Sequence, residues 1–291
     1  MTPRRPTTGD AGLVVELLRA YDEAHGADPD VDASELLDEW REVELDRDAW
    51  LWDEDGRADA FGCVFGRGEL QHVDGYVHPD ARGRGLGTEI LRLGEERARE
   101  RGGTRVHVGT LHADGAARRL LEARGYAFVR AFLRMGIELE AEPTVPAMPD
   151  GIALVSLTEA DDAEVHAVAE SAFRDHWDHV PRSLDQFRRR YEATDRGLWV
   201  GARAGDELVA ASVNELRFGG GWVGSLGTLR EWRGRGLAQA LLLASFRLFR
   251  ERGERNVQLG VDAESPTGAV RVYERVGMHV VWRADVYEKR L

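Results

Sequence analysis

The stretch Arg82-Gly-Arg-Gly-Leu-Gly87 decides how this sequence is interpreted, because nearly the same six residues return as Arg233-Gly-Arg-Gly-Leu-Ala238, 151 residues later. A second landmark follows both copies: Glu122-Ala-Arg-Gly125 returns as Glu274-Arg-Val-Gly277, 152 residues later. Landmarks that recur in one order at nearly one spacing indicate internal duplication. Because the spacing is the length of a domain, we predict two tandem domains rather than a solenoid of short repeats.

The boundary between the two copies is expected in residues 140–151, which hold three prolines and few apolar side chains. Proline removes a backbone donor and fixes φ, so this stretch is typical of an extended linker. We therefore predict domains at 1–140 and 152–291. Early in each domain stands a threonine with an acid three residues later, Thr7 and Thr158, a spacing typical of a helix N-cap.

The order of the expected elements is similar in the two halves. An amphipathic helix follows each capping threonine, and strands with turns then lead into the glycine-rich stretch. In the second half we expect a helix at 237–252, a strand at 256–261, a helix at 268–276 and a strand at 279–287. The fold class we predict is mixed α/β, of the α+β kind, with two tandem domains that each have a mostly antiparallel mixed sheet flanked by helices.

The composition of the 291-residue chain limits its possible functions. The chain is 43% hydrophobic with a formal net charge of -13, so it can form packed cores but opposes non-specific binding to nucleic acid. The most apolar stretch, 237–246, is about half of what a membrane span needs, and no apolar run follows the N-terminal arginines. The one cysteine, Cys63, excludes an internal disulfide and is expected in a buried strand. We expect a cytoplasmic protein that binds neither nucleic acid nor membrane.

The glycine-rich stretches are candidate cradles for a diphosphate. Each is expected to follow a strand and open a helix, where free backbone N–H groups and the helix dipole favour an anion. Glycine lets the backbone approach a phosphate closely, and Arg82 or Arg233 can add positive charge. A tight turn without a ligand is the alternative. A dinucleotide fingerprint would need the spacing G-x-G-x-x-G and a nucleoside-triphosphate loop would need Gly-Lys-Ser/Thr, and these stretches have neither.

Both halves resemble the GCN5-related N-acetyltransferase (GNAT) superfamily. The resemblance rests on the two glycine-rich stretches and on Ser265-Pro-Thr-Gly-Ala-Val-Arg-Val-Tyr273-Glu-Arg-Val-Gly277-Met, which follows the second one. A tandem pair of such domains also resembles mycothiol synthase and its relatives. The resemblance spans nearly the whole chain and implies acetyl-CoA as the cofactor and an N-acetyltransferase reaction.

The resemblance also implies which residues bind coenzyme A. In the second half the thioester arm would lie along the strand that ends at residues 227–229, and the diphosphate on the amides of the loop after it. In the first half the same roles fall on the end of the strand before the loop and on the loop. Ser265 stands where the family often has Asn. The cofactor-binding residues that we predict are Gly227, Thr228, Leu229, Arg233, Gly234, Arg235, Gly236, Leu237, Ala238, Gln239 and Ser265 in the second half, and Val77, Arg82, Gly83, Arg84, Gly85, Leu86, Gly87 and Thr88 in the first.

Acetyl transfer from a thioester involves two proton movements, and the sequence offers a group for one of them. Tyr273 stands at the family's general-acid position, and a phenol can return a proton to a departing thiolate. Its alternative role is an aromatic side chain packed on the sheet. The matching residue in the first half is Leu121, which cannot donate a proton. We therefore expect the N-terminal domain to be catalytically degenerate, whether it still binds coenzyme A or is only structural.

The general base is not evident from the sequence. The family often places an acid on the strand before the loop, but residues 222–229 contain none. Glu215, on the preceding strand, is our candidate for the catalytic base. Asp262 and Glu264 are alternatives, and any of the three can instead be a surface or capping carboxylate.

The segment Asp175-His176-Trp177-Asp178-His179 is polar and aromatic and is expected between two helices. Two histidines three residues apart would need further ligands to bind a metal, and none is obvious, so we predict no metal site. We interpret the segment as the rim of an acceptor pocket. A helix end anchored by Trp177 is the alternative.

Three hypotheses for the function follow. The first is an acetyl-CoA-dependent N-acetyltransferase that acts on a primary amine of a small molecule or peptide by direct attack in a ternary complex. The second is a coenzyme A-binding pseudoenzyme or sensor, and the third is acetylation of a cysteinyl sugar as in mycothiol synthase. The chain is expected to be a monomer or a homodimer.

Overall fold

The computed structural model describes residues 2–27, 31–41, 43–174, 176–177, 179–265 and 267–291. Contacts divide the chain into two compact units: unit 1 comprises Met1–Phe132 and Trp282–Leu291, and unit 2 comprises Leu133–Val281. These bounds differ from the expected 1–140 and 152–291, because the C-terminal residues belong to the first unit.

Two long strands explain this division of the chain. The C-terminal strand β11 (His279–Arg290) pairs antiparallel with β4 (Arg105–Leu111) of unit 1 over Ala284–Arg290. Strand β5 (Ala127–Glu138) begins in unit 1, but its later residue Met135 is fully buried in the core of unit 2. The end of β11 therefore belongs to unit 1 because it pairs with β4, and the end of β5 belongs to unit 2 because it is buried there. The position of the linker alone predicts neither assignment.

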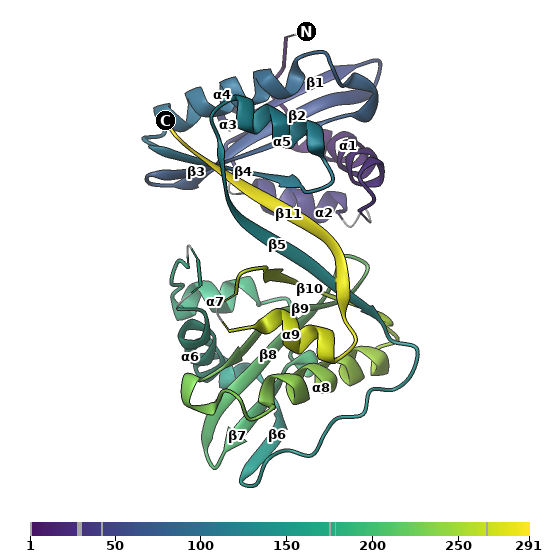
Figure 1. Ribbon diagram of the computed structural model, residues 1–291, viewed down its shortest axis with the longest axis vertical. Coiled ribbons are helices and arrows are strands. Elements are labelled where there is room, and N and C mark those ends of the chain that lie inside the picture. Colours follow the sequence, from purple (N-terminus) through teal and green to yellow (C-terminus); the bar gives the residue numbers. More distant parts are fainter. Residues whose placement is uncertain (1, 28–30, 42, 175, 178, 266) are drawn as a thin grey trace. The chain divides into compact units, whose positions relative to one another are not determined.

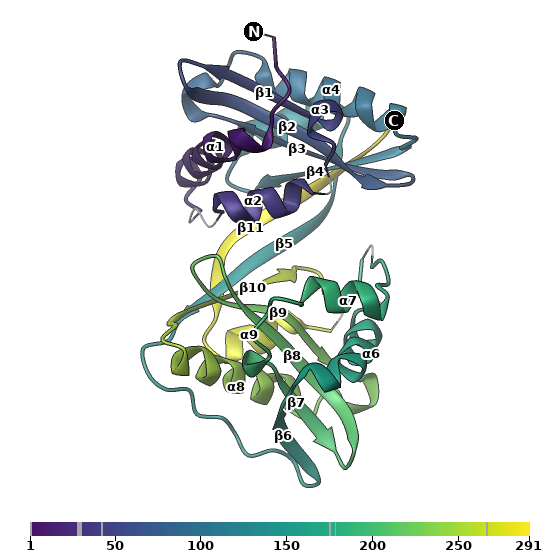
Figure 2. The same ribbon diagram turned by 180° about the vertical axis from the view of Figure 1, so that it is seen from behind.

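Unit 1 is a sheet with helices on both faces. In both views α1 and α2 cover one face and α4 covers the other (Figures 1 and 2). Side chains of β2 alternate between these faces: Phe61 and Cys63 are buried with α1 and α2, whereas Ala60 and Val64 are buried with α4. The other strands and helices of this unit are β1 (Ala49–Glu54), β2 (Arg57–Arg67), β3 (Leu70–Val77), α1 (Ala11–Ala24), α2 (Ala33–Trp40), α3 (Leu45–Asp48), α4 (Leu86–Glu100) and α5 (Gly115–Ala123).

The strands of unit 1 follow the order β1-β2-β3-β4-β11, and the sheet opens between β3 and β4. Strands β1, β2 and β3 pair antiparallel, but β3 and β4 are parallel. Within the described residues their ladder joins only Leu70–His72 to Arg105–His107. The remaining halves of β3 and β4 therefore diverge toward their carboxyl ends, where the glycine-rich loop begins.

Unit 2 repeats this plan with the strand order β5-β10-β9-β8-β7-β6. Strands β9 and β10 of this unit pair parallel, and their ladder joins Gly221–Trp222 to Val257–Gln258. Helices α6 and α7 lie on one face of the sheet and α8 and α9 on the other (Figures 1 and 2). The bounds are β6 (Ile152–Ser156), α6 (Asp162–Phe173), α7 (Leu184–Arg190), β7 (Val200–Ala204), β8 (Glu207–Arg217), β9 (Gly220–Thr228), α8 (Leu237–Glu251), β10 (Asn256–Asp262) and α9 (Ala269–Arg275).

The observed elements confirm the predicted fold class, a mixed α/β fold with mostly antiparallel sheets flanked by helices. The four elements expected at the end of the second half are α8, β10, α9 and β11. Thr7 and Thr158 form the expected capping boxes, in which the carboxylates of Asp10 and Asp161 accept hydrogen bonds from the threonine amides at 2.7 and 2.8 Å. Each box begins a short 3-10 turn that continues into α1 or α6.

Candidate coenzyme A sites

The glycine-rich loops have the same backbone conformation in both units. Gly83 and Gly85 have φ of 76° and 80°, and Gly234 and Gly236 have φ of 76° and 81°. L-residues other than glycine adopt this left-handed region only at a cost. No atom lies within 4 Å of a Cβ placed on any of these four glycines. The glycines are thus required by the turn rather than by crowding, and the turn leaves the N-termini of α4 and α8 free to bind an anion.

Unit 1 contains a cavity of about 390 Å³ at the divergence of β3 and β4. Its apolar wall is formed by side chains such as Val73 and Val77 of β3, Ile90 of α4 and Leu120 of α5. Its volume lies within the usual range for ligand pockets. Of the residues predicted to bind coenzyme A in this half, Val77, Arg82, Gly83, Gly85, Leu86, Gly87 and Thr88 line it.

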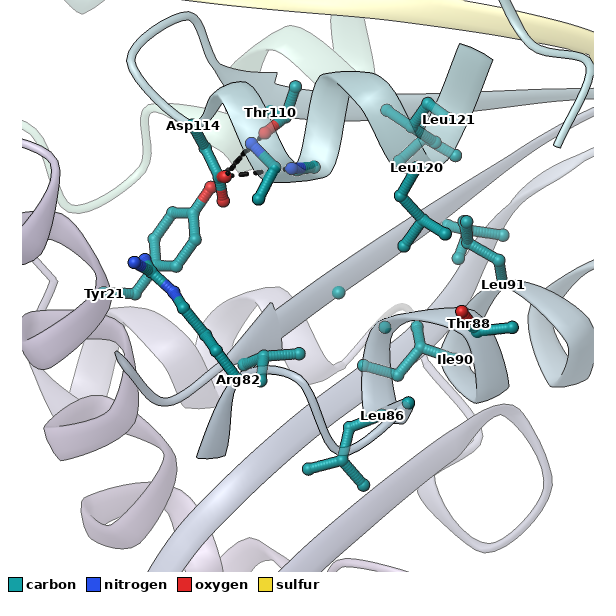
Figure 3. A pocket seen from close by; sticks show the side chains of 18 of the residues that line it. Tyr21, Arg82, Leu86, Thr88, Ile90, Leu91, Thr110, Asp114, Leu120 and Leu121 are labelled. Carbon is teal, nitrogen blue, oxygen red and sulfur yellow. Dashed lines mark hydrogen bonds between the residues drawn. The ribbon is translucent and has the colours of Figure 1, made fainter. Parts of the chain in front are cut away.

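Polar side chains gather at one end of this cavity, where Figure 3 shows Tyr21, Arg82 and Asp114 together. The Tyr21 hydroxyl lies 3.3 Å from Thr110 Oγ1, and Asp114 caps α5 by accepting the Ala116 and Ala117 amides at 3.1 and 2.9 Å. Burial, the largest cause, raises the pKa of Tyr21 well above its usual value. The phenol therefore stays protonated at neutral pH.

Arg82 donates from Nη2 to Nε2 of His25 at 2.8 Å, and the other ring nitrogen of His25 lies 2.7 Å from the Tyr21 carbonyl oxygen. The same His25 Nε2 lies 3.4 Å from Asp114 Oδ2. Arg84, the remaining predicted residue of this loop, instead binds the buried carboxylate of Asp59 at 2.5 Å. The exposed Arg84 side chain is thus engaged in an ion pair with a buried carboxylate beside the loop.

In unit 2 the predicted loop residues also gather at the end of β9. The Arg233 guanidinium bonds the carbonyl oxygens of Thr228 and Ala172 at 3.2 and 3.3 Å. Arg235 lies 4.5 Å over the ring of Trp232. Gly227 packs against α6, since a Cβ at this position would lie 3.1 Å from that of Ala172. The structure places Leu229 just after β9, and Leu237, Ala238 and Gln239 in the first turn of α8.

Tyr273 lies on α9 and is buried in the main core of unit 2. Burial raises the pKa of its hydroxyl to about 12. Among the described residues no group hydrogen-bonds this hydroxyl. The phenol is therefore a proton donor at neutral pH that is not committed to a structural partner.

Glu215, the candidate base, is held in an ion pair. Its two carboxylate oxygens accept hydrogen bonds from the Arg190 guanidinium at 2.9 and 3.2 Å. Of the alternatives, Asp262 is buried and accepts the backbone amide of Glu264 at 2.9 Å. Both carboxylates thus have hydrogen-bond partners, and a proton acceptor at Glu215 would work against its pairing with a cation.

A model of the acetyltransferase (GNAT) family matches the chain twice, at residues 14–126 and 163–278. The chain belongs to the GNAT family. The predicted family, the tandem arrangement and the N-acetyltransferase class are thus confirmed.

Relatives extend over the whole length of this GNAT chain. A mycothiol acetyltransferase of Thermobispora bispora is 32% identical to it, over 98% of both chains. A GCN5-related N-acetyltransferase of Sphaerobacter thermophilus is 35% identical with a TM-score of 0.88, over 99% of this chain and 95% of its own. A tandem GNAT protein from the clavulanic acid biosynthesis pathway shares the fold with a TM-score of 0.77 at 19% identity, over 99% of this chain and 97% of its own.

The remaining predicted features of this GNAT chain are only partly placed. Ser265 lies before α9, with its hydroxyl 2.9 Å from that of Thr267. Asp175 and Asp178 lie outside the described residues, whereas His179 Nε2 lies 3.2 Å from Glu170. In the parts of the chain that the structure describes, no three metal-ligating side chains gather at one point. No helix within those same parts is long and apolar enough to span a membrane.

Sequence reasoning missed the polar end of the unit 1 cavity. Asp114 stands 151 residues before Ser265, so the duplication itself points to it. It also missed Asp74 on β3, although the rule that sought an acid on the strand before the second loop finds one when applied to the first. Tyr21 and Thr110 had no such signature, because only the fold brings α1 beside the end of β4.

Proposed function

We propose that the chain transfers an acetyl group from acetyl-CoA to the primary amine of a small molecule or peptide, by direct attack within a ternary complex. One observation carries this proposal: the left-handed glycines at the N-terminus of α4 open onto a cavity of about 390 Å³ in the cleft of the sheet. A diphosphate with a long neutral arm has the shape and chemistry that a loop followed by such a cleft accommodates.

The residues of unit 1 fit acetyl-CoA. The amides from Gly83 to Thr88 would bind the diphosphate, and Arg82 would add charge once its guanidinium turns from His25. Val73 and Val77 offer an apolar wall and a free strand edge to the arm. In unit 2 the corresponding amides run from Gly234 to Gln239, and the strand edge ends at Thr228, whose buried hydroxyl lacks a hydrogen-bond partner among the described residues.

Bound acetyl-CoA would supply the activated thioester. In unit 2 the Tyr273 hydroxyl would give its proton to the departing sulfur. Its pKa of about 12 keeps the proton on the hydroxyl at neutral pH, so that the phenol can donate a hydrogen bond to the sulfur as negative charge develops there.

The experiment is thiol release with Tyr273→Phe, using acetyl-CoA and a panel of primary amines. Removing the proton donor is expected to slow release by about 10²-fold, with acetyl-CoA binding by calorimetry unchanged. Tyr191→Phe is the matched control, because it removes another buried phenol from the same unit. Full activity of Tyr273→Phe excludes this role for the tyrosine.

A coenzyme A-binding pseudoenzyme is a second candidate function, and the Arg190–Glu215 ion pair favours it. That pair occupies the carboxylate that was the candidate base of unit 2. Calorimetric binding of acetyl-CoA without thiol release for any amine would support this candidate. Such a result would contradict the transferase.

Acetylation of a cysteinyl sugar is a third candidate, favoured by the 32% identity over the full length to the mycothiol acetyltransferase of Thermobispora bispora. It is a special case of amine acetylation. Comparison of thiol release with a cysteinyl amino sugar and with simple amines distinguishes it. A preference of less than tenfold for the cysteinyl sugar counts against it.

A further inference from the structure

His25 ends α1 next to two residues that line the polar end of the unit 1 cavity, Tyr21 and Arg82. Its two ring nitrogens have fixed roles. Nδ1 lies 2.7 Å from the Tyr21 carbonyl oxygen, which can only accept, so Nδ1 carries the hydrogen. Nε2 lies 2.8 Å from Nη2 of Arg82, and a guanidinium can only donate, so Nε2 is the acceptor. The imidazole is therefore neutral while it holds Arg82.

The same Nε2 also faces the Asp114 carboxylate, which lies at the same end of the cavity as Arg82 (Figure 3). Asp114 Oδ2 is 3.4 Å from this nitrogen, and the side chains of His25 and Asp114 are only 6% and 10% exposed. A protonated ring would donate to Asp114 and would repel Arg82. The two arrangements exclude each other: His25 either accepts from Arg82 or, with one more proton, pairs with Asp114.

The other titratable groups near this ring are neutral or paired elsewhere. Tyr21 has its ring 4.4 Å from that of His25, and burial raises its pKa well above the usual value, so it stays protonated at neutral pH. Tyr76 of β3 meets Tyr21 edge to face, and burial raises its pKa likewise. Asp80, on the turn Pro79–Ala81 that contacts α1, pairs with Arg57 at 3.3 Å. The balance at His25 is therefore set by the arginine and the carboxylate on its Nε2.

A diphosphate bound at the loop would change this balance. The anion attracts the Arg82 guanidinium, which has no carboxylate partner among the described residues to hold it back. Nε2 of His25 then loses its donor. The buried Asp114 carboxylate keeps its bonds to the Ala116 and Ala117 amides, but it would face an anion without a cation beside it. A proton on His25 compensates this charge, because histidine is the side chain that changes charge between pH 5 and 8.

Unit 2 has the histidine and the arginine but not the carboxylate. The positions 151 residues after those of the unit 1 group hold His176, Arg233 and Ser265. Arg233 bonds the Ala172 carbonyl oxygen, which corresponds to the Tyr21 carbonyl that His25 occupies in unit 1. Ser265 has no charge for a cation to balance. A proton-accepting arrangement that needs this carboxylate is therefore specific to unit 1.

We propose, resting on the binding of acetyl-CoA in the proposed function, that unit 1 takes up a proton at His25 when it binds the diphosphate, so that its occupancy by the cofactor depends on pH. Arg82 passes from Nε2 to the diphosphate, one proton from the solvent goes to Nε2, and the imidazolium donates to Asp114 Oδ2. Because the bound state holds one more proton, the affinity of unit 1 rises as the pH falls, by up to about tenfold for each pH unit.

Calorimetry in buffers of different ionisation enthalpy counts the proton that acetyl-CoA binding takes up. At pH 7 the wild-type chain should take up as much as about one proton more than His25→Gln. Glutamine can still donate to the Tyr21 carbonyl and accept from Arg82, but it cannot be protonated. Titration of the phosphates of the cofactor is common to both chains and cancels in the difference. Asp114→Asn keeps the cap of α5 and should also lose this uptake, whereas His176→Gln, the matched change in unit 2, should keep it.

Nitrogen NMR shifts of the His25 ring give a readout that does not depend on acetyl transfer. The free chain should show the neutral tautomer with hydrogen on Nδ1, and saturation with acetyl-CoA should convert it to the imidazolium. Between pH 6 and pH 8 the wild-type affinity should fall by about tenfold more than that of His25→Gln. Circular dichroism with thermal unfolding verifies that each variant is folded.

Proton uptake that is equal in the wild type and His25→Gln, or that is lost in His176→Gln instead, overturns the proposal. Thiol release with an amine then still supports the proposed function. Proton uptake that depends on His25, without thiol release for any amine, leaves the proton-linked site standing and removes the transferase.

Discussion

Units 1 and 2 share their anion-binding loop but differ on both sides of it. The left-handed glycines of the two loops agree within a few degrees. On the strand before the loop, unit 1 has Asp74 where unit 2 has Ser225, and on the helix after the next strand unit 1 has Leu121 where unit 2 has Tyr273. At these two positions each unit thus carries one titratable side chain where the other unit has none or only a hydroxyl that does not titrate. The duplication has retained the cradle, which depends on backbone, more closely than the chemistry, which depends on side chains.

The space beside the loop differs in the same way. In unit 1 the rings of Tyr21 and Tyr76 meet edge to face at 5.4 Å. The residues 151 positions later are Ala172 and Gly227, where a Cβ on the glycine would already lie 3.1 Å from the alanine. Two aromatic rings in one unit thus correspond to direct helix–strand contact in the other. We infer that an acceptor would meet different walls in the two units.

The largest effect that separates the units is expected from a charge placed in each loop. Gly85→Asp puts a carboxylate beside the amides of unit 1 and forces an L-residue to φ near 80°. Repulsion of the diphosphate and strain of the turn should weaken acetyl-CoA binding to that unit by about 10²-fold. Gly236→Asp is the matched change in unit 2. Calorimetry should show one fewer site in each variant, and an unchanged stoichiometry in both would show that neither loop binds the cofactor.

A smaller effect is expected from the ion pair that only unit 2 carries. Arg190→Met leaves the buried Glu215 carboxylate without its bidentate partner. Because the Arg190 side chain is 40% exposed, the loss should be about 2 kcal/mol of unfolding free energy, below the range for a fully buried pair. Urea unfolding measures it. The double variant Arg190→Met/Glu215→Gln should recover most of the loss, and if it does not, the arginine stabilises the unit by packing alone.

These comparisons also show what the sequence could predict. Backbone requirements leave a direct record: the glycines, the capping threonines and the 151-residue offset located the loops and most elements. The sequence does not indicate that the end of β5 belongs to unit 2 and the end of β11 to unit 1. Strand pairing between distant parts of a chain depends on which edge of a sheet is open, and no local sequence pattern records that. Asp74 could have been found from the sequence, because the family often has an acid on the strand before the loop. The ion pair of Glu215 with Arg190 could not, because only the fold brings α7 to β8.

The missing phenol of unit 1 can be restored. Leu121→Tyr in a Tyr273→Phe background places a proton donor where unit 1 has only an apolar wall. We expect thiol release to rise by up to tenfold and no more, because a thiol has a pKa of about 8.5 and its thiolate can leave with little help from an acid. Leu121 is buried, so overpacking should cost about 1–3 kcal/mol, which thermal unfolding measures. A stable variant with unchanged release would show that the sulfur does not lie near α5.

The smallest effect concerns the stability of unit 1 and follows from the raised pKa of Asp74. Its folded-state pKa of about 6 lies above the usual 3.8, so the folded chain holds this proton more tightly than the unfolded chain. The stability that Asp74 contributes is therefore complete below about pH 4 and is lost as the pH rises to about 6. Asp74→Asn avoids that loss, and its advantage over the wild type should grow by about 1 kcal/mol between pH 5 and pH 7.5.

Thermal unfolding of both chains at the two pH values measures this difference, and Ser225→Ala should show none. An advantage that does not change with pH would mean that the carboxylate is already neutralised in the folded chain. A growing advantage would show that Asp74 destabilises the chain in which it stands. That cost would distinguish unit 1 from unit 2, where Ser225 stands at the corresponding position and carries no charge.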